Sequence, residues 1–154
     1  MARLITIILY GYWFTFWALN SLDKLLNGTD LGLFTWYGKD RTHQFIIYLE
    51  RLGWTQDLYM PLMLYISVIE MLIALVFLWA ILVIFHVQDP KHRKFQVSIK
   101  LPIILSLLCF IGFSIWDIVT GDRAELLEHE TYLIALCTTY IISKWEITEK
   151  SKSL

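Results

Sequence analysis

Four ionisable side chains lie in or next to long apolar runs of the sequence: Asp23, Lys24, Glu70 and Asp117. A charge inside the apolar layer of a membrane is costly, so such groups usually face one another or water, and they often mark ion, proton or ligand sites. Glu70 is the deepest, about 13 Å along a helix from Pro61. Asp23 and Asp117 could be solvated at the membrane surface, and Lys24 could extend its amine to the headgroups. We therefore expect a paired or functional role above all for Glu70.

Polar residues near these four predict a common pocket. One face of the first apolar run carries four of them at helical spacing: Asn20, Asp23, Lys24 and Asn27. The third run carries a stripe of small and polar residues: Ser106, Cys109, Phe113, Asp117 and Thr120. We expect a polar intramembrane pocket that opens to the outer face, with Lys24 as the counter-ion of Glu70 or Asp117. The expected pocket residues are Asn20, Asp23, Lys24, Glu70, Trp116 and Asp117.

The sequence gives little support for a metal or a cofactor held by this chain alone. The histidines are divided between loops (His43, His92) and opposite membrane surfaces (His86, His129), so no two of them can ligate haem. Residues 122–130 are acidic with one histidine, which suits a solvated helix start better than a cation site. The two cysteines do not form a CxxC motif. A net charge of −1 and the absence of phosphate-loop or nucleic-acid motifs exclude nucleic acid as a partner. No catalytic residue can be named, and quinone or lipid is the expected ligand.

Apolar segments long enough to cross a bilayer must position these residues. Hydrophobic residues make up 57% and charged residues 18% of the sequence, whereas soluble domains contain about half and about a quarter. A membrane-spanning helix needs about 20 apolar residues. We predict an all-α integral membrane protein, a single domain over 1–154 built as a four-helix transmembrane bundle. The predicted spans are 4–22, 60–85, 99–119 and 131–145, with Pro61 and Pro102 in the first turns of the second and third. The fourth is short and dotted with hydroxyl groups, which favours packing against other helices.

The segment 23–59 between the first two spans is predicted to lie on the outer surface. Its glycines mark turns, and its aromatic residues Phe34, Trp36 and Tyr37 suit the membrane interface. Residues 42–52 show apolar residues at helical spacing and end before Gly53, which predicts an amphipathic interfacial helix.

Positively charged residues predict the orientation. With the N-terminus inside, the inner side holds eight Lys and Arg residues and the outer side five, and the loop 88–94 carries most of this bias. We therefore expect both termini in the cytoplasm and the chain in the inner membrane of a prokaryote. The first span is too long and too aromatic for a cleaved signal peptide, so we interpret it as a retained anchor.

Three short motifs resemble the DoxX-like family of small membrane proteins: residues 20–28, residues 68–72 around Glu70, and Trp116-Asp117 with 120–122. This resemblance implies a four-helix membrane bundle with Lys24, Glu70 and Asp117 as its polar positions. The family includes the small membrane subunit (DoxD type) of thiosulfate:quinone oxidoreductase. This sequence departs from the family pattern in its long outer segment and in lacking a glycine-rich stretch after Glu70.

Three functions follow as hypotheses. The first is an accessory membrane subunit of a quinone-linked oxidoreductase complex, in which the pocket accepts a quinone head or a proton and a partner subunit supplies the redox cofactor. The second is a purely structural or assembly subunit of a multi-subunit membrane complex. The third, a small transporter or proton path, is least favoured because the charges gather in one half of the membrane and no internal repeat is visible.

Overall fold

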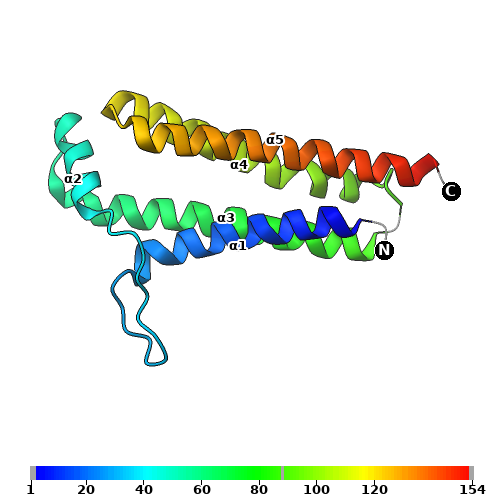
Figure 1. Cartoon of the computed structure of the whole chain (residues 1–154), viewed down its shortest axis with the longest axis horizontal. Helices are drawn as coiled ribbons and strands as arrows, with labels where there is room; N and C mark the ends of the chain where they lie inside the picture. Colours follow the sequence, from blue (N-terminus) through cyan, green and yellow to red (C-terminus); the bar gives the residue numbers. More distant parts are fainter. Residues whose placement is uncertain (1–2, 88, 153–154) are drawn as a thin grey trace. The chain divides into compact units, whose positions relative to one another are not determined.

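The computed structural model describes residues 3–87 and 89–152, and within these ranges the chain is helical, with its longest connection at residues 27–41 between the first two helices (Figure 1). Residue 88, in the loop that predicts the orientation, lies outside them. The elements in chain order are α1 (Leu4–Leu26), α2 (Thr42–Arg51), the 3-10 turn η1 (Gln56–Leu58), α3 (Tyr59–His86), α4 (Arg93–Thr120) and α5 (Arg123–Lys152).

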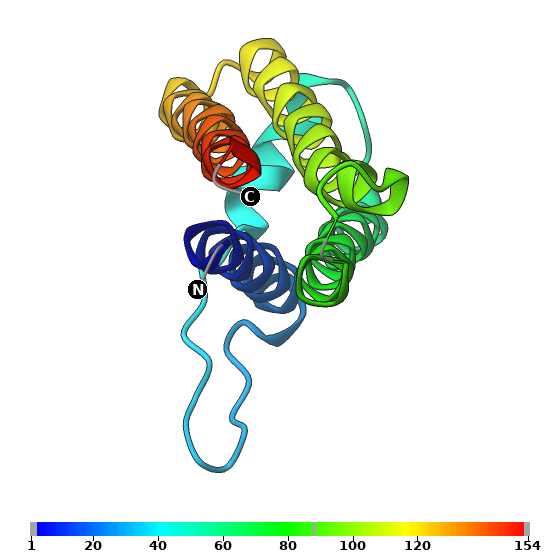
Figure 2. The same cartoon turned by 90° about the vertical axis from the view of Figure 1, so that its right-hand side faces the viewer.

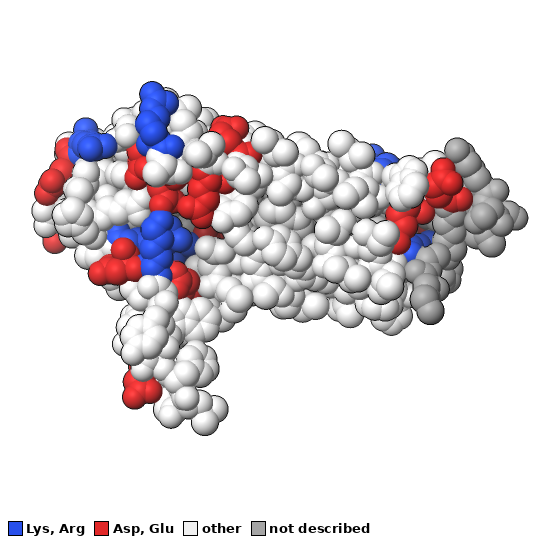
Figure 3. All heavy atoms as spheres, viewed as in Figure 1, with Lys and Arg blue, Asp and Glu red and all other residues white. Residues whose placement is uncertain are grey.

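Three of these segments are long and apolar enough to cross a membrane: Leu4–Leu26, Gln56–His86 and Arg93–Thr120. On the face shown in Figure 3, charged side chains gather toward the ends of the helices and the stretch between them carries almost none. The expected membrane protein with transmembrane helices is supported by these three segments. The predicted fourth span, 131–145, lies within the single helix α5, which does not belong to this set.

The start of the third span differs from the prediction. Its apolar run begins at Ile99, but α4 begins at Arg93, where the side chain of His92 caps the helix by accepting from the backbone N–H of Lys94. Pro102 therefore lies inside the helix, and its predicted place in the first turn was wrong. Hydropathy marks where a segment becomes apolar, whereas a helix begins where its hydrogen bonds do. As proline lacks an N–H, the carbonyl of Ser98 has no helix partner at this position.

A tight turn joins α4 to α5. Gly121 ends α4 in the left-handed conformation, with φ of 77°, and its N–H donates to the carbonyl of Asp117. The carboxylate of Asp122 then accepts from the backbone N–H groups of Ala124 and Glu125, which are free at a helix start. The interpretation of the acidic stretch 122–130 as a helix start is confirmed.

The chain divides into two compact units, and both divisions fall inside a helix, so each unit is described by itself. Unit 1 comprises Met1–Phe14 and Ile73–Leu154, and unit 2 comprises Thr15–Leu72. The single domain over 1–154 stays a prediction.

Unit 1 contains the start of α1, the second half of α3, and all of α4 and α5. Helices α4 and α5 lie side by side and antiparallel (Figures 1 and 2). From α1, the hydroxyl of Tyr10 donates to the carbonyl of Ile99 on α4 at 2.6 Å, and its ring meets that of Phe77 on α3 edge to face. The indole N–H of Trp13 donates to the hydroxyl of Thr139 on α5 at 3.0 Å. These contacts join four helical segments around a buried aromatic core.

Charged side chains hold the ends of two helices in unit 1. The carboxylate of Glu146 on α5 accepts from the backbone N–H groups of Ile5 and Thr6 at 3.1 and 2.9 Å, at the start of α1. The guanidinium of Arg3 donates to the carbonyls of Ile84 and Val87 at 3.2 and 2.6 Å, at the end of α3. The helix N-terminus carries a partial positive charge and the C-terminus a partial negative charge, so both side-chain charges have the stabilising sign.

Unit 2 contains the second half of α1, α2, η1 and the first half of α3. Ser21 and Ser67 exchange hydrogen bonds between hydroxyl and carbonyl groups at 2.8 and 3.0 Å, which joins α1 to α3. The predicted helix over 42–52 is confirmed by α2, and Gly53 follows it with φ of 69°. Ahead of α2, the backbone N–H of Thr42 donates to Asp40, and this hydrogen bond lowers the pKa of that exposed carboxyl. The position of α2 on an outer surface stays a prediction.

Candidate functional site: two buried polar pairs

An ion pair between Lys24 and Glu70 is the central feature of unit 2. The amine Nζ lies 2.6 Å from Oε2 and 2.8 Å from Oε1 of Glu70, and it also donates to the carbonyl of Asn20 at 3.2 Å. The side chains of Lys24 and Glu70 are only 5% and 4% exposed. An amine has three N–H groups, so all the donors of Lys24 are used. The pair is closed and fully hydrogen-bonded on its cationic side.

The helical repeat explains why this glutamate is buried. Met63, Ser67, Glu70, Ala74 and Phe77 recur at three- and four-residue steps on α3, and all are buried, whereas intervening residues such as Val68 and Leu72 are exposed. Glu70 therefore replaces an apolar residue on the packed face of the helix. Such a carboxylate must have a partner, since an unpaired buried charge is very costly.

Two further charges act on this pair. The guanidinium of Arg41 and the carboxylate of Asp23 both interact electrostatically with Lys24 and Glu70. Together the four side chains form a cluster with no net formal charge. Arg41 was not among the predicted site residues, because it lies between the predicted spans and no apolar run drew attention to it.

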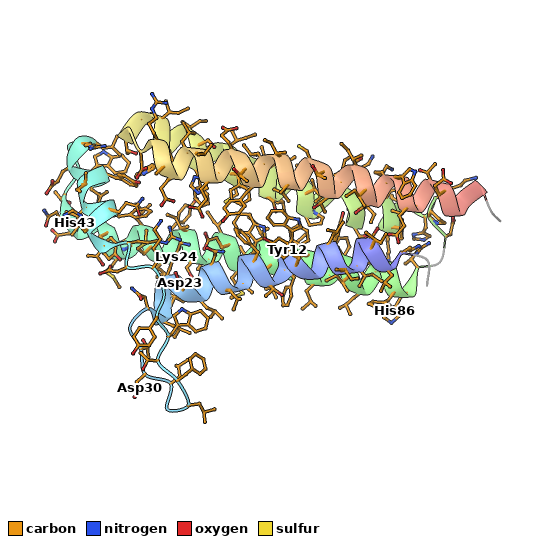
Figure 4. The ribbon with its side chains drawn as sticks, in the orientation of Figure 1. Tyr12, Asp23, Lys24, Asp30, His43 and His86 are labelled. Atoms are coloured by element: carbon orange, nitrogen blue, oxygen red, sulfur yellow. The ribbon has the colours of Figure 1, made fainter. Side chains whose placement is uncertain are left out.

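Asp23, which precedes Lys24 in the sequence and is labelled beside it in Figure 4, also binds the segment that follows α1. Its carboxylate accepts from the indole N–H of Trp36 at 2.8 Å and from the backbone N–H of Lys39 at 3.2 Å. A Cβ atom on Gly38 would collide with this carboxylate, so the close approach requires glycine. Asp23 thus holds the segment that follows α1 against the last turn of this helix. The side chain of Asn20 also turns to its own helix and donates to the carbonyl of Phe16.

A second buried pair lies in unit 1, between α4 and α5. Nδ1 of His129 lies 2.6 Å from Oδ2 of Asp117, and the two atoms share a hydrogen bond. The side chain of Asp117 is 4% exposed and that of His129 is 16% exposed. The imidazole also packs against two rings of α4, with centroids 5.9 Å from Phe110 and 5.1 Å from Phe113. An ionised carboxylate can only accept, so when Asp117 is ionised the hydrogen is on Nδ1, and Nε2 of a neutral imidazole is then the proton-accepting atom.

The predicted site residues therefore fall into two sets. Asn20, Asp23, Lys24 and Glu70 belong to unit 2, and Trp116 and Asp117 belong to unit 1. Of the two partners left open for Lys24, the structure selects Glu70, and Asp117 is bound by His129 instead. One pocket that contains all six residues stays a prediction.

The partnership of His129 could have been found from the turn. Gly121 reverses the chain, so residues shortly before it on α4 lie beside residues shortly after it on α5. Asp117 and His129 both occupy the faces that these two helices bury against each other. The sequence-based prediction places His129 at a membrane surface and names no partner for it.

The structure offers no metal centre within the described ranges, where no three His, Cys, Asp or Glu side chains are arranged to hold an ion. Cys109 on α4 and Cys137 on α5 form no disulfide. The comparisons with known proteins add no family: no family model, no curated protein and no solved structure matches the chain. The class that fold and site define is a helical membrane protein with two buried polar pairs.

Proposed function

We propose that the chain is a DoxX-like accessory membrane subunit of a larger, quinone-linked redox complex. The observation that carries this proposal is the buried Lys24–Glu70 pair, held between two helices that are apolar enough to cross a membrane. A helix that serves only as an anchor gains nothing from a buried charge, so an intramembrane ion pair is a functional-site hypothesis by default.

The four-span bundle in this proposal is supported by the outward face of α5. Large apolar side chains are exposed along it at helical steps: Leu127, Ile134, Ile141 and Trp145. The exposed hydroxyls of Thr131 and Thr138 donate to carbonyls of their own helix, four residues back. Such hydroxyls need no water, so this face is compatible with lipid. Localisation in a prokaryotic inner membrane with both termini in the cytoplasm belongs to the proposal.

In the proposed role, a quinone head exchanges contacts with the charged pair. The amine of Lys24 can donate to a quinone carbonyl in place of its contact with Asn20, and Glu70 can hold or release a proton. The second pair, Asp117–His129, offers another proton-accepting atom in an aromatic surrounding. The chain offers no evident means of holding a redox cofactor, so a partner subunit supplies it, and other subunits of the complex are the expected partners.

The test is quinone reduction by the purified complex with Glu70→Gln. This substitution keeps the size of the side chain and removes its charge and its proton. We expect quinone reduction to fall about a hundredfold or more, since a positioned proton-transferring group contributes about 10²–10⁴-fold. Ser67→Ala, one turn earlier on the same face of α3, is the matched control and should leave turnover unchanged. Unchanged kinetics and quinone affinity in Glu70→Gln would reject the site.

A structural or assembly role is the second candidate, and the saturation of Lys24 favours it. All three donors of the amine are already used, and both side chains are nearly inaccessible. Under this function, the double variant Lys24→Met/Glu70→Leu assembles with its partners and leaves turnover unchanged. If the double variant assembles normally and loses turnover, the pair takes part in the chemistry. A flavin, haem or iron–sulfur protein that co-purifies in mild detergent would support the redox complex under either role.

A further inference from the structure

Residues 27–40 form a hairpin whose tip presents exposed apolar side chains. We propose that this hairpin lies in the headgroup region of the lipid bilayer and inserts its tip toward the acyl chains, as a lateral membrane anchor. The proposal concerns a different part of unit 2 from the charged pair and does not depend on quinone chemistry.

The hairpin is ordered by its own backbone. Gly28 donates to the carbonyl of Trp36 at 2.9 Å, Trp36 donates to the carbonyl of Thr29 at 2.9 Å, and Leu31 donates to the carbonyl of Phe34 at 3.0 Å. At the tip, the N–H of Gly32 donates to the carboxylate of Asp30 at 2.8 Å, and Gly32 takes a φ of 82°. The tip is therefore prearranged, and its insertion into lipid would cost little further ordering.

The base of the hairpin is fixed to the end of a candidate membrane span. Asp23 lies in the last turn of α1 and binds both Trp36 and Lys39 of the returning arm of the hairpin. Within unit 2 the hairpin leaves the end of α1 sideways instead of continuing along its axis (Figures 1 and 4). If α1 crosses the bilayer, a segment that leaves its end sideways runs along the membrane surface.

The composition of the tip matches that position. Leu33 is 96% and Tyr37 is 90% exposed, and Leu31 and Phe34 are also exposed. Residues 31–38 carry no charge. In water this apolar surface would be unfavourable, whereas aromatic and aliphatic side chains at the end of a membrane span accumulate at the interface. A lipid surface therefore fits the tip better than water. If α1 crosses the bilayer, the membrane surface lies next to the hairpin, because the hairpin starts at the end of α1.

The experiment places a fluorescent label on the tip of the full chain. Leu33→Cys is prepared in a variant with Cys109→Ala and Cys137→Ala, labelled with a polarity-sensitive dye, and reconstituted alone into vesicles of phosphatidylcholine and phosphatidylglycerol. The control label is at His43→Cys, an exposed position on α2. We expect the Leu33 label to emit at shorter wavelength, to be quenched by nitroxide lipids, and to be several-fold less accessible to iodide than the His43 label.

Two outcomes would overturn the proposal. One is equal iodide quenching of the two labels in vesicles. The other is protection of the Leu33 label only in the intact complex, because a partner protein would then occupy the tip. Phe34→Cys provides a second tip position, and a melting temperature unchanged from the unlabelled chain confirms that the labelled variants are folded. The vesicle measurement uses no quinone and no partner, so its failure is separate from failure of the proposed function.

Discussion

The two buried polar pairs solve the same physical problem in different ways. Lys24 and Glu70 join helices that are far apart in the sequence, through two short contacts between side chains that are 5% and 4% exposed. Asp117 and His129 join neighbouring helices across a tight turn, through one contact and with a partly exposed imidazole. In the first pair every donor of Lys24 is used, whereas the second pair is a single hydrogen bond that persists when the imidazole is neutral.

Because of this difference, the two pairs suit different roles: one stabilises the fold and the other can exchange a proton. A buried ion pair is tolerated only while both partners are present, because removal of one leaves an uncompensated charge in an apolar environment. A carboxylate–imidazole pair can gain or lose a proton and remain connected. The ion pair of unit 2 therefore contributes mainly to stability. The imidazole of His129 in unit 1 is the group better suited to exchange protons.

The largest effect is expected from Lys24→Met. This change leaves the carboxylate of Glu70 buried without its cation, and breaking a buried pair costs about 3–5 kcal/mol. Thermal unfolding in detergent, followed by loss of the monodisperse peak in size-exclusion chromatography, measures it. A melting temperature equal to that of the unmodified chain would mean that the pair contributes nothing.

A smaller loss is expected from His129→Phe. Phenylalanine fits beside Phe110 and Phe113, but it leaves the carboxylate of Asp117 without its donor, at a cost of about 2 kcal/mol. Glu130→Gln changes the next residue of α5, which is exposed, and serves as the control. The comparison of the two pairs fails if His129→Phe is as damaging as Lys24→Met in the same assay.

Glu146→Ala tests a charge that acts on a helix end instead of on another side chain. The carboxylate accepts from Ile5 and Thr6 at the start of α1, and loss of such a cap costs about 1 kcal/mol. Faster hydrogen exchange confined to the first turn of α1 would be the matching local signature. Exchange that rises equally along the whole helix would contradict the capping role.

The smallest effect is expected from Ser67→Ala. Its hydroxyl makes a neutral contact with Ser21 one turn away from Glu70, and interhelical hydrogen bonds in membranes contribute about 0.6 kcal/mol on average. A loss of stability close to that of Lys24→Met would show that the α1–α3 contact depends on the serines and not on the charges.

Sequence patterns predicted the helical class, the helix α2 and Glu70 as a paired residue, because apolar periodicity and the cost of a buried charge are local properties. The pattern around Lys24 narrowed its partner to two acids, and only the packing of α1 against α3 selects Glu70. Hydropathy also located the third span but not the start of α4 at Arg93, since charged residues can extend a helix beyond its apolar part.

The missed residues share one cause. Arg41 acts on the charged pair from a connection, Glu146 reaches α1 from the far end of α5, and His129 reaches Asp117 across a turn. Each contact depends on which faces of two elements meet. The sequence alone does not show this for Arg41 and Glu146, and for His129 only the turn at Gly121 indicates it.

The central claim is that Lys24 and Glu70 stabilise the chain only as a pair, and a double-mutant cycle tests it most directly. Unfolding free energies are measured for the unmodified chain, Lys24→Met, Glu70→Leu and the double variant in the same detergent. The account predicts that the double variant loses less stability than either single variant, so that the coupling exceeds about 3 kcal/mol, the smallest loss expected for one single variant. Losses that simply add, to within about 0.5 kcal/mol, would contradict it.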